Sequence, residues 1–268
     1  MLNKRILTPY EKNQMLKYGI NLEELLNTDA PVEYITGHVE FLGLDLLVSP
    51  SVLIPRIETE ELVELAVNKS EILGKKNNHN QILQIVDVGT GSGAIAISVA
   101  KKFSKLGIAF QITGLDISLD ALEIARINLQ NINPKLPISF IKSDLLAELN
   151  DRVNLDKLGN PDNSIDLIIA NLPYIPSARI KILDNSVKDF EPHLALDGGP
   201  DGLDLVRKLL KQAEEQLSKN GEILLELDIT HTQKKMKEFE NKWKVKIIES
   251  SASGVNFGIL SHKNLECL

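Results

Sequence analysis

The residues Asn171-Leu172-Pro173-Tyr174 place a side-chain amide, a proline and an aromatic ring directly after a mainly apolar run, 164–170. If that run is a strand, the Asn171 amide and a main-chain carbonyl freed from the sheet stand at its end. Together with the flat ring, these groups can hold a planar substrate that carries an –NH2 group. An ordinary turn is the alternative, because Asn and Pro are common where strands end. Residues upstream decide between the two.

A glycine-rich motif follows the first regular apolar run of the chain, 82–86, and precedes a helical pattern that begins at Ala94. The motif reads Asp87-Val88-Gly89-Thr90-Gly91-Ser92-Gly93. Its alternating glycines let the backbone pass close to a ligand and adopt dihedral angles that other residues avoid. The helix beyond offers unpaired N–H groups and the positive end of its dipole. The order of strand, tight turn and helix therefore predicts a ligand site.

The glycines alone do not choose the ligand, because Gly89, Gly91 and Ala94 also satisfy the dinucleotide fingerprint. Asp87 lies two residues before the first glycine, where a carboxylate would repel a pyrophosphate but attract an ammonium group. S-adenosylmethionine carries a nucleoside at one end and an ammonium group at the other. The acid therefore favours S-adenosylmethionine, and an NAD-dependent oxidoreductase is the least favoured alternative.

Strands and helices alternate from residue 82 onward, which predicts a mostly parallel sheet covered by helices on both faces. The expected strands are 82–88, 110–116, 138–142, 165–170, 222–228, 244–250 and 255–261. The expected helices are 93–103, 119–131 with Ser118 as its cap, 202–218 and 231–242, and a polar insert spans 150–163. Only a short segment joins the last two strands, which indicates a terminal hairpin and one antiparallel strand.

Acids follow further expected strands, where sheets of this kind bind ligands. Asp116, followed by Ile117, can accept hydrogen bonds from both ribose hydroxyls, and capping of the next helix is the alternative. Asp144 can accept from an adenine amino group with Leu145 against the ring, and the start of a helical turn is the alternative. Suitable groups at successive strand ends indicate one shared site. The predicted cofactor-binding residues are Asp87, Gly89, Thr90, Gly91, Ser92, Gly93, Asp116, Ile117, Asp144, Leu145 and Asn171.

The first part of the chain has a different pattern. Residues 8–26 carry helix-like apolar spacing broken at Gly19, and 39–48 predict a hairpin around Gly43. A helix is expected over 60–68, with Thr59 or Glu58 as its cap.

The composition limits the classes of function. The 268 residues, 43% of them apolar, suffice for one large domain and a small one. The net charge of −7 and the lack of a long basic run count against a nucleic-acid partner. The single cysteine, Cys267, allows no internal disulfide, and no Cys or His cluster has metal-ligand spacing. Without an apolar run of about 18 residues or a signal-peptide pattern, we expect a cytoplasmic protein that does not span a membrane. We also expect a monomer.

Over residues 31–260 the chain resembles the HemK-type methyltransferases, which are the release factor glutamine methyltransferases. Besides the two motifs and Asp116-Ile-Ser, the matching signatures are Pro31-Val-Glu-Tyr34-Ile-Thr-Gly37, Val52-Leu-Ile-Pro55-Arg56-x-Glu58-Thr59-Glu60, Glu191-Pro192, Ala195-Leu196 and Gly198-Gly-Pro-Asp201-Gly202-Leu203. The resemblance implies an α/β fold: a Rossmann-like, class I SAM-dependent methyltransferase with a seven-stranded sheet. We expect a short helical region and hairpin over 1–55, on the substrate side, and the methyltransferase domain over 56–268.

The resemblance also implies an activity: methyl transfer from S-adenosylmethionine to the side-chain amide nitrogen of the glutamine in the Gly-Gly-Gln motif of class I peptide chain release factors. We hypothesise that the Asn171 oxygen and the Leu172 carbonyl accept the two N–H bonds of that amide. Pro173 would hold the turn and Tyr174 would pack on the amide plane. Orientation is then the main task, since the methyl group is already activated.

The chain departs from the family pattern at three places. Leu172 stands where the family has proline, and only about 30 residues precede Pro31, so the N-terminal region is short. Asp228 and, approximately, Phe257 stand where the family has glycine and arginine.

Other functions use the same motifs. A ribosomal-protein glutamine methyltransferase and a nucleic-acid adenine methyltransferase would both hold a planar –NH2 group. A module that binds the cofactor or a release factor without catalysis is an alternative of another class. Arg56 and Glu58 would either shape the substrate channel or form an ion pair between the N-terminal region and the catalytic domain.

Overall fold

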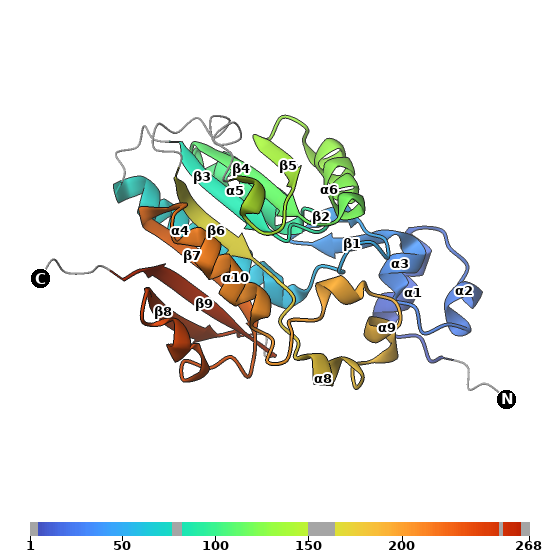
Figure 1. Ribbon diagram of the computed structural model, residues 1–268. Helices are drawn as coiled ribbons and strands as arrows, with labels where there is room; N and C mark the ends of the chain where they lie inside the picture. Colours follow the sequence, from blue (N-terminus) through green and yellow to red (C-terminus); the bar gives the residue numbers. More distant parts are fainter. Residues whose placement is uncertain (1–4, 77–81, 150–163, 252–253, 264–268) are drawn as a thin grey trace, which may run out of the picture.

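The structure, a computed structural model, describes residues 5–76, 82–149, 164–251 and 254–263 (Figure 1). The polar insert predicted over 150–163 and Cys267 lie outside the described residues. Within them, no helix is both long and apolar enough to cross a membrane. The same residues contain no group of His, Cys, Asp or Glu side chains arranged to hold a metal ion.

A seven-stranded sheet forms the centre of the molecule, with the strand order β5-β4-β3-β6-β7-β9-β8. Its strands are β3 (Leu83–Val88), β4 (Phe110–Asp116), β5 (Ile138–Lys142), β6 (Ile165–Ala170), β7 (Leu217–Asp228), β8 (Trp243–Glu249) and β9 (Val255–His262). Only β9 runs antiparallel to its neighbours, β7 and β8. The predicted mostly parallel sheet with one antiparallel strand is therefore confirmed.

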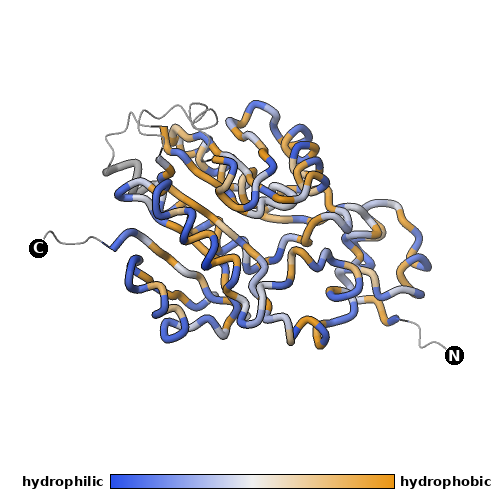
Figure 2. Tube along the Cα trace, viewed as in Figure 1, coloured by the Kyte–Doolittle hydropathy of each residue, from blue (hydrophilic) through white to orange (hydrophobic). Residues whose placement is uncertain are grey.

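Helices cover both faces of this sheet, and alternate residues of each strand reach opposite faces. In β6, Leu167 and Ile169 pack with α4 (Ile57–Lys76), α5 (Ala94–Leu106) and α6 (Leu119–Ile132). Ile168 and Ala170 pack with α10 (Asp204–Ala213) on the other face. Figure 2 shows the hydrophobic residues concentrated along the central strands. Burial on both faces explains why these strands read as continuous apolar runs in the sequence.

Two predicted helices differ from the structure. The helix expected over 231–242 is wrong: only a short 3₁₀ turn, η4 (Lys235–Phe239), forms there. The side chain of Gln233 instead pairs with the main chain of edge strand β8, donating to the Val245 carbonyl and accepting from the Ile247 N–H. The helix expected over 202–218 is shorter, because β7 already begins at Leu217.

The N-terminal region consists of α1 (Pro9–Lys17), α2 (Glu23–Leu26), α3 (Val32–Thr36) and a hairpin, β1 (His38–Phe41) and β2 (Leu44–Leu47). The predicted interruption at Gly19 and the predicted hairpin around Gly43 are confirmed. Helix α1 begins with a capping box in which Thr8 and Glu11 satisfy each other's backbone N–H groups. The helices bury a small core of their own, made of Leu7, Met15, Leu25 and Val32.

The hairpin packs differently from these helices. Its residues Phe41 and Leu46 belong to the main core, together with α4 and α5. The buried side chain of Asn128, on α6, accepts from the Leu47 N–H at 2.7 Å and donates to the Leu47 and Ser92 carbonyls at 2.9 Å. This side chain joins the hairpin to the glycine motif. The boundary expected at residue 55 stays a prediction, and the packing of 38–54 is continuous with the large core.

Candidate active site

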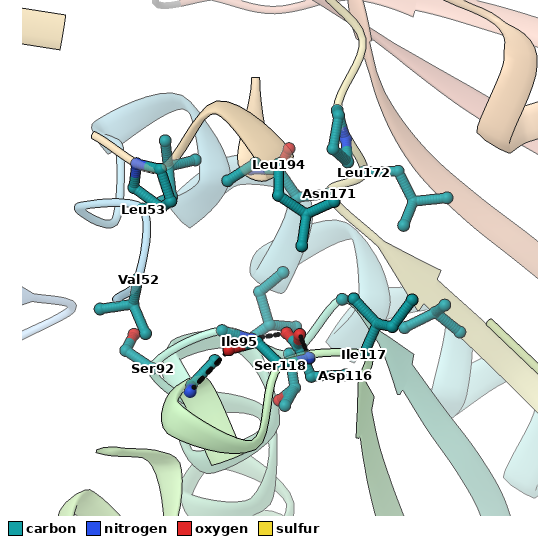
Figure 3. Close-up of a pocket in the computed structure, with 18 of the residues that line it drawn as sticks. Val52, Leu53, Ser92, Ile95, Asp116, Ile117, Ser118, Asn171, Leu172 and Leu194 are labelled. Carbon is teal, nitrogen blue, oxygen red and sulfur yellow. Dashed lines mark hydrogen bonds between the residues drawn. The ribbon is translucent and has the colours of Figure 1, made fainter. Parts of the chain in front are cut away.

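A cavity of about 230 Å³ opens at the carboxyl ends of β3, β4 and β6. The predicted site residues that line it are Gly89, Thr90, Gly91, Ser92, Asp116, Ile117, Asp144, Leu145, Asn171, Leu172 and Pro173. Asp87, Gly93 and Tyr174 are not among the lining residues. Figure 3 shows Asn171, Leu53 and Leu194 on one side of the cavity and Ser92, Asp116 and Ser118 across it.

The glycine motif forms the predicted tight turn between β3 and α5. Gly89, Gly91 and Gly93 all have positive φ angles, of 73°, 55° and 80°. Such angles favour glycine because a Cβ atom would meet the backbone. A Cβ on Gly89 would also lie 3.2 Å from the Leu172 side chain, so the turn passes closely beneath the Asn171 segment. The Leu at position 172 is buried in that contact.

Asp87 lies behind the turn and is fully buried. Its Oδ2 accepts hydrogen bonds from the Thr90 hydroxyl at 2.7 Å and the Ala96 N–H at 3.1 Å. Its Oδ1 has no partner among the described residues. Burial raises the pKa of Asp87 from its ordinary value of 3.8 to about 7. The carboxylate therefore shapes the turn, and the expected contact with an ammonium group stays a prediction.

Asp116 connects the end of β4 to the glycine turn. Its carboxylate accepts from the Gly91 N–H and the Ser118 N–H, both at 2.9 Å. The predicted capping of α6 by Ser118 is confirmed, since its hydroxyl accepts from the Ala121 N–H at 3.2 Å. Burial raises the pKa of Asp116. The Asp116 carboxylate lines the cavity, and the half-exposed Ile117 side chain adds an apolar surface at the cavity wall.

Asp144 and Leu145 follow β5. The Asp144 carboxylate forms an ion pair with Lys208 of α10, and its carbonyl accepts from the Ala147 N–H at the start of η1 (Ala147–Leu149). Leu145 has a φ of 56°, which is uncommon for a residue with a side chain. Strained backbone of this kind gathers at ligand sites, and Leu145 lines the cavity.

Asn171 stands at the end of β6, and a chain of hydrogen bonds holds its amide. The Asn171 Nδ2 donates to the Thr59 hydroxyl at 3.0 Å, and that hydroxyl donates to Glu226 at 2.7 Å. The other oxygen of Glu226 accepts from the Tyr174 hydroxyl at 3.0 Å. Burial and the nearby Glu226 charge raise the pKa of Tyr174. Tyr174 therefore supports the site from within the fold, and its predicted packing on a substrate amide stays a prediction.

A loop that contains α8 (Ser177–Ile180), α9 (Asn185–Lys188) and η3 (His193–Ala195) follows β6 and returns to it. The Ile175 N–H donates to the Leu196 carbonyl, and the Gly198 N–H donates to the Ile175 carbonyl. A Cβ on Gly202 would lie 2.2 Å from the Tyr174 carbonyl oxygen, so only glycine permits this approach. The Gly198–Gly202 signature therefore supports the backbone that carries Asn171.

Arg56 forms an ion pair with Glu191, and both residues lie within 56–268, the expected methyltransferase domain. A role of Arg56 and Glu58 in the substrate channel or in a pair between the two regions stays a prediction. The Arg56 Nη2 lies 2.6 Å from the Glu191 carboxylate, which joins the segment before α4 to the loop after β6. Burial raises the pKa of Glu191, while the Arg56 charge opposes that rise.

Several residues of the site were not predicted from the sequence. Thr59 was expected as a helix cap, but α4 begins at Ile57 and the Thr59 hydroxyl bonds to Glu226 instead. Glu226 lies within β7, where the apolar pattern of the sequence predicts a strand but no role for this acid. Val52, Leu53, Pro55 and the exposed Leu194 also line the cavity. Only the Arg56-x-Glu58-Thr59-Glu60 signature could have drawn attention to Thr59.

The residues present fit S-adenosylmethionine. The glycine turn leaves room for close approach, Asp116 offers acceptors beside an apolar Ile117, and Asp144 and Leu145 offer an acceptor beside a second apolar surface. Figure 3 shows Ser92, Asp116 and Ser118 across the cavity from Asn171, so a ligand held at Asp116 would face the Asn171 segment.

The sheet order and the site define a Rossmann-like methyltransferase of class I, a class that uses S-adenosylmethionine as the methyl donor. A sequence profile for a methyltransferase domain matches residues 79–258. The fold is similar to that of the ribosomal protein L11 methylase from Lactobacillus delbrueckii subsp. bulgaricus, with a TM-score of 0.52, 19% identity, and 81% of this chain and 84% of that chain covered.

Sequence relatives define the family more narrowly. The chain is 36% identical over 236 residues to the release factor glutamine methyltransferase of Lactococcus lactis, covering 88% of this chain and 78% of the relative. It is 39% identical over 197 residues to that of Koribacter versatilis, covering 74% of this chain and 62% of the relative. The chain thus spans less than two thirds of the Koribacter protein's length. It belongs to the family of release factor glutamine methyltransferases.

Proposed function

We propose that the protein transfers a methyl group from S-adenosylmethionine to the side-chain amide nitrogen of the glutamine in the Gly-Gly-Gln motif of class I peptide chain release factors. The names of its relatives support the substrate. The observation that carries the proposal is the orientation of Asn171 at the cavity wall. Its Nδ2 is engaged by Thr59, and within the described residues no hydrogen bond reaches its Oδ1.

The chemistry asks for orientation more than for a strong base. An amide nitrogen is a weak nucleophile because its lone pair is delocalised into the carbonyl. When bound, the cofactor supplies an activated methyl group on a positively charged sulfur. The Asn171 Oδ1 and the Leu172 carbonyl would accept the two N–H bonds of the substrate amide, polarise them and aim the lone pair. The N–C bond forms as the S–C bond breaks, and the amide proton then leaves to water.

The partner and the setting belong to the same proposal. We expect the protein to act as a monomer in the cytoplasm, on a release factor and without nucleic acid. The net charge of −7 supports a protein partner over a polyanion.

Methyl transfer from labelled S-adenosylmethionine tests the function directly. Parallel reactions contain a class I release factor, the same factor with its motif glutamine replaced by alanine, ribosomal proteins, or DNA. Label on the first factor and none on its alanine variant is the expected result. Label on ribosomal proteins instead would identify a ribosomal-protein methyltransferase, and label on DNA would identify a nucleic-acid methyltransferase. Cofactor binding without any labelled product would identify the protein as a non-catalytic binding module.

A further inference from the structure

The amide of Asn171 is the end of a hydrogen-bond chain that draws on three separate elements. Asn171 follows β6, Thr59 lies in the first turn of α4, and Glu226 lies in β7. Glu226 and Thr59 are buried, and Tyr174 donates to the second oxygen of the same carboxylate. These contacts join residues that are 112 and 167 positions apart in the sequence.

The number of hydroxyl protons in this hydrogen-bond chain fixes the direction of each bond. An ionised carboxylate only accepts hydrogen bonds, so both hydroxyls that face Glu226 must donate to it. The Thr59 hydroxyl has one proton, and the bond to Glu226 uses it. Toward Asn171, Thr59 can then only accept. The Asn171 amide must therefore turn its Nδ2 to Thr59, which leaves Oδ1 for a ligand.

We infer that Thr59 and Glu226 are positioning residues that set the orientation of the Asn171 amide and so make the site select a carboxamide over a carboxylate. The inference rests on the proposed function, in which Asn171 meets the substrate amide. An outward Oδ1 accepts from the –NH2 of glutamine but repels the oxygens of glutamate. With the amide reversed, an outward –NH2 would favour glutamate instead.

A purely structural role explains Glu226 poorly. Burial raises the pKa of this carboxyl group, so keeping it ionised among core residues opposes folding. The nearby Arg56 charge favours the ionised form, and the Glu58 charge opposes it. Its side chain shares the α4 face of β7 with Leu224, where an apolar residue would pack without desolvation. A buried acceptor that fixes the proton of the Thr59 hydroxyl is what the amide orientation requires.

The test compares Thr59→Val, which keeps the shape and removes the hydroxyl, with Thr59→Ser, which keeps the hydroxyl. Thr113→Val is a matched control, because Thr113 is a buried threonine of β4 outside the cavity wall. Two readouts are taken: kcat and KM for the release factor, and the ratio of dissociation constants for the factor and its glutamine-to-glutamate variant. The ratio cancels contacts elsewhere on the factor.

We expect Thr59→Val to lower kcat about tenfold or more and to lower the glutamine preference by a similar factor, which corresponds to one oriented hydrogen bond. In Thr59→Ser and Thr113→Val, kcat and the glutamine preference should each stay within about threefold of the unchanged protein. A Thr59→Val protein that is folded and keeps its kcat and its preference overturns the inference, while the proposed function stands. If the unchanged protein leaves the release factor unlabelled, the proposed function and this inference fall together.

A double variant tests Glu226. Because Glu226 acts on Asn171 through Thr59, adding Glu226→Gln to Thr59→Val should leave the glutamine preference at the Thr59→Val level. A further loss of preference in the double variant would mean that Glu226 acts independently, and would overturn the ordered chain.

Discussion

The guanidinium of Arg56 lies 2.6 Å from the carboxylate of Glu191, whose side chain is only 1% exposed. This contact holds the loop after β6 against the segment that leads into α4. Both segments carry residues of the cavity wall, Pro55 before α4 and Pro192 in the loop. The ion pair therefore fixes one side of the site.

Arg56→Ala should destabilise the protein by about 3–5 kcal/mol, because it leaves a buried carboxylate without its partner. Part of that loss should be recovered at acidic pH, where Glu191 binds a proton and its charge disappears. Denaturant unfolding at several pH values measures both effects. The control is Lys102→Ala, which removes the partner of Glu64, a side chain that is 52% exposed, and should cost less than about 1 kcal/mol. Equal losses for the two variants would contradict the prediction.

The raised pKa of Asp87 predicts a pH dependence of stability. The folded protein binds this proton up to a pH of about 7, whereas the unfolded chain releases it near 3.8. The protonated group thus contributes stability that is complete below 3.8 and is lost as the pH rises to about 7, on the order of 4 kcal/mol. Asp87→Asn should flatten the decline of unfolding free energy with pH. An unchanged slope would contradict the raised pKa.

The same group offers a test of the predicted contact with the cofactor. A cation near Asp87 would lower the pKa of its carboxyl group in the complex. Affinity for S-adenosylmethionine should then fall as the pH drops below about 7, and Asp87→Asn should remove that dependence. Isothermal titration calorimetry across this range measures the effect. A dependence that persists in Asp87→Asn would assign it to another group.

Asp116→Ala should weaken cofactor binding about tenfold to a hundredfold, because it removes an acceptor from the cavity and frees the Gly91 N–H that holds the turn. Binding of S-adenosylmethionine by calorimetry measures the loss. Asp120→Asn is the control, since Asp120 is an exposed acid in the first turn of α6, outside the cavity wall. Similar losses in both variants would mean that general charge, and not the position of Asp116, attracts the ligand.

Gly202→Ala and Gly43→Ala separate backbone strain from contact. Both glycines have positive φ, of 79° and 70°, so each substitution carries a strain of about 1–2 kcal/mol. A Cβ on Gly202 would also meet the Tyr174 carbonyl at 2.2 Å, whereas Gly43 has open space. Gly202→Ala should therefore destabilise by at least about 1 kcal/mol more and lower kcat, because the Asn171 backbone shifts. Thermal unfolding and kcat are measured for both variants. Equal losses of stability and of kcat in the two would contradict the supporting role of Gly202.

Local patterns predicted most of the sheet and much of the site, because strands buried on both faces read as continuous apolar runs. The strand ends that carry Asp116 and Asn171 could be located in this way. The helix expected over 231–242 failed because of its weak apolar pattern: in η4 only Met236 and Phe239 are buried. A side chain pairing with an edge strand, as Gln233 does, leaves no periodic signal.

Long-range contacts were beyond the reach of such patterns. Thr59 has the residue type of a helix cap and stands near the start of α4, so local reasoning gave it that role. Its actual partner, Glu226, is 167 positions away. Asp87 shows a second limit: its spacing from the glycines predicted a ligand contact, which stays a prediction, but gave no sign of its bonds to Thr90 and Ala96.

Asn171→Ala should lower turnover about a hundredfold or more while leaving S-adenosylmethionine affinity within about threefold. The loss is large because the substitution removes an acceptor that acts on the reacting group itself. Cofactor affinity is spared because Ser92 and Asp116 lie across the cavity from Asn171 (Figure 3). Single-turnover labelling of the release factor and calorimetry with the cofactor measure the two quantities. Asn185→Ala, an exposed asparagine in α9, is the control. Unchanged turnover in Asn171→Ala would remove Asn171 from the reaction, and a parallel loss of cofactor affinity would make it a cofactor ligand instead.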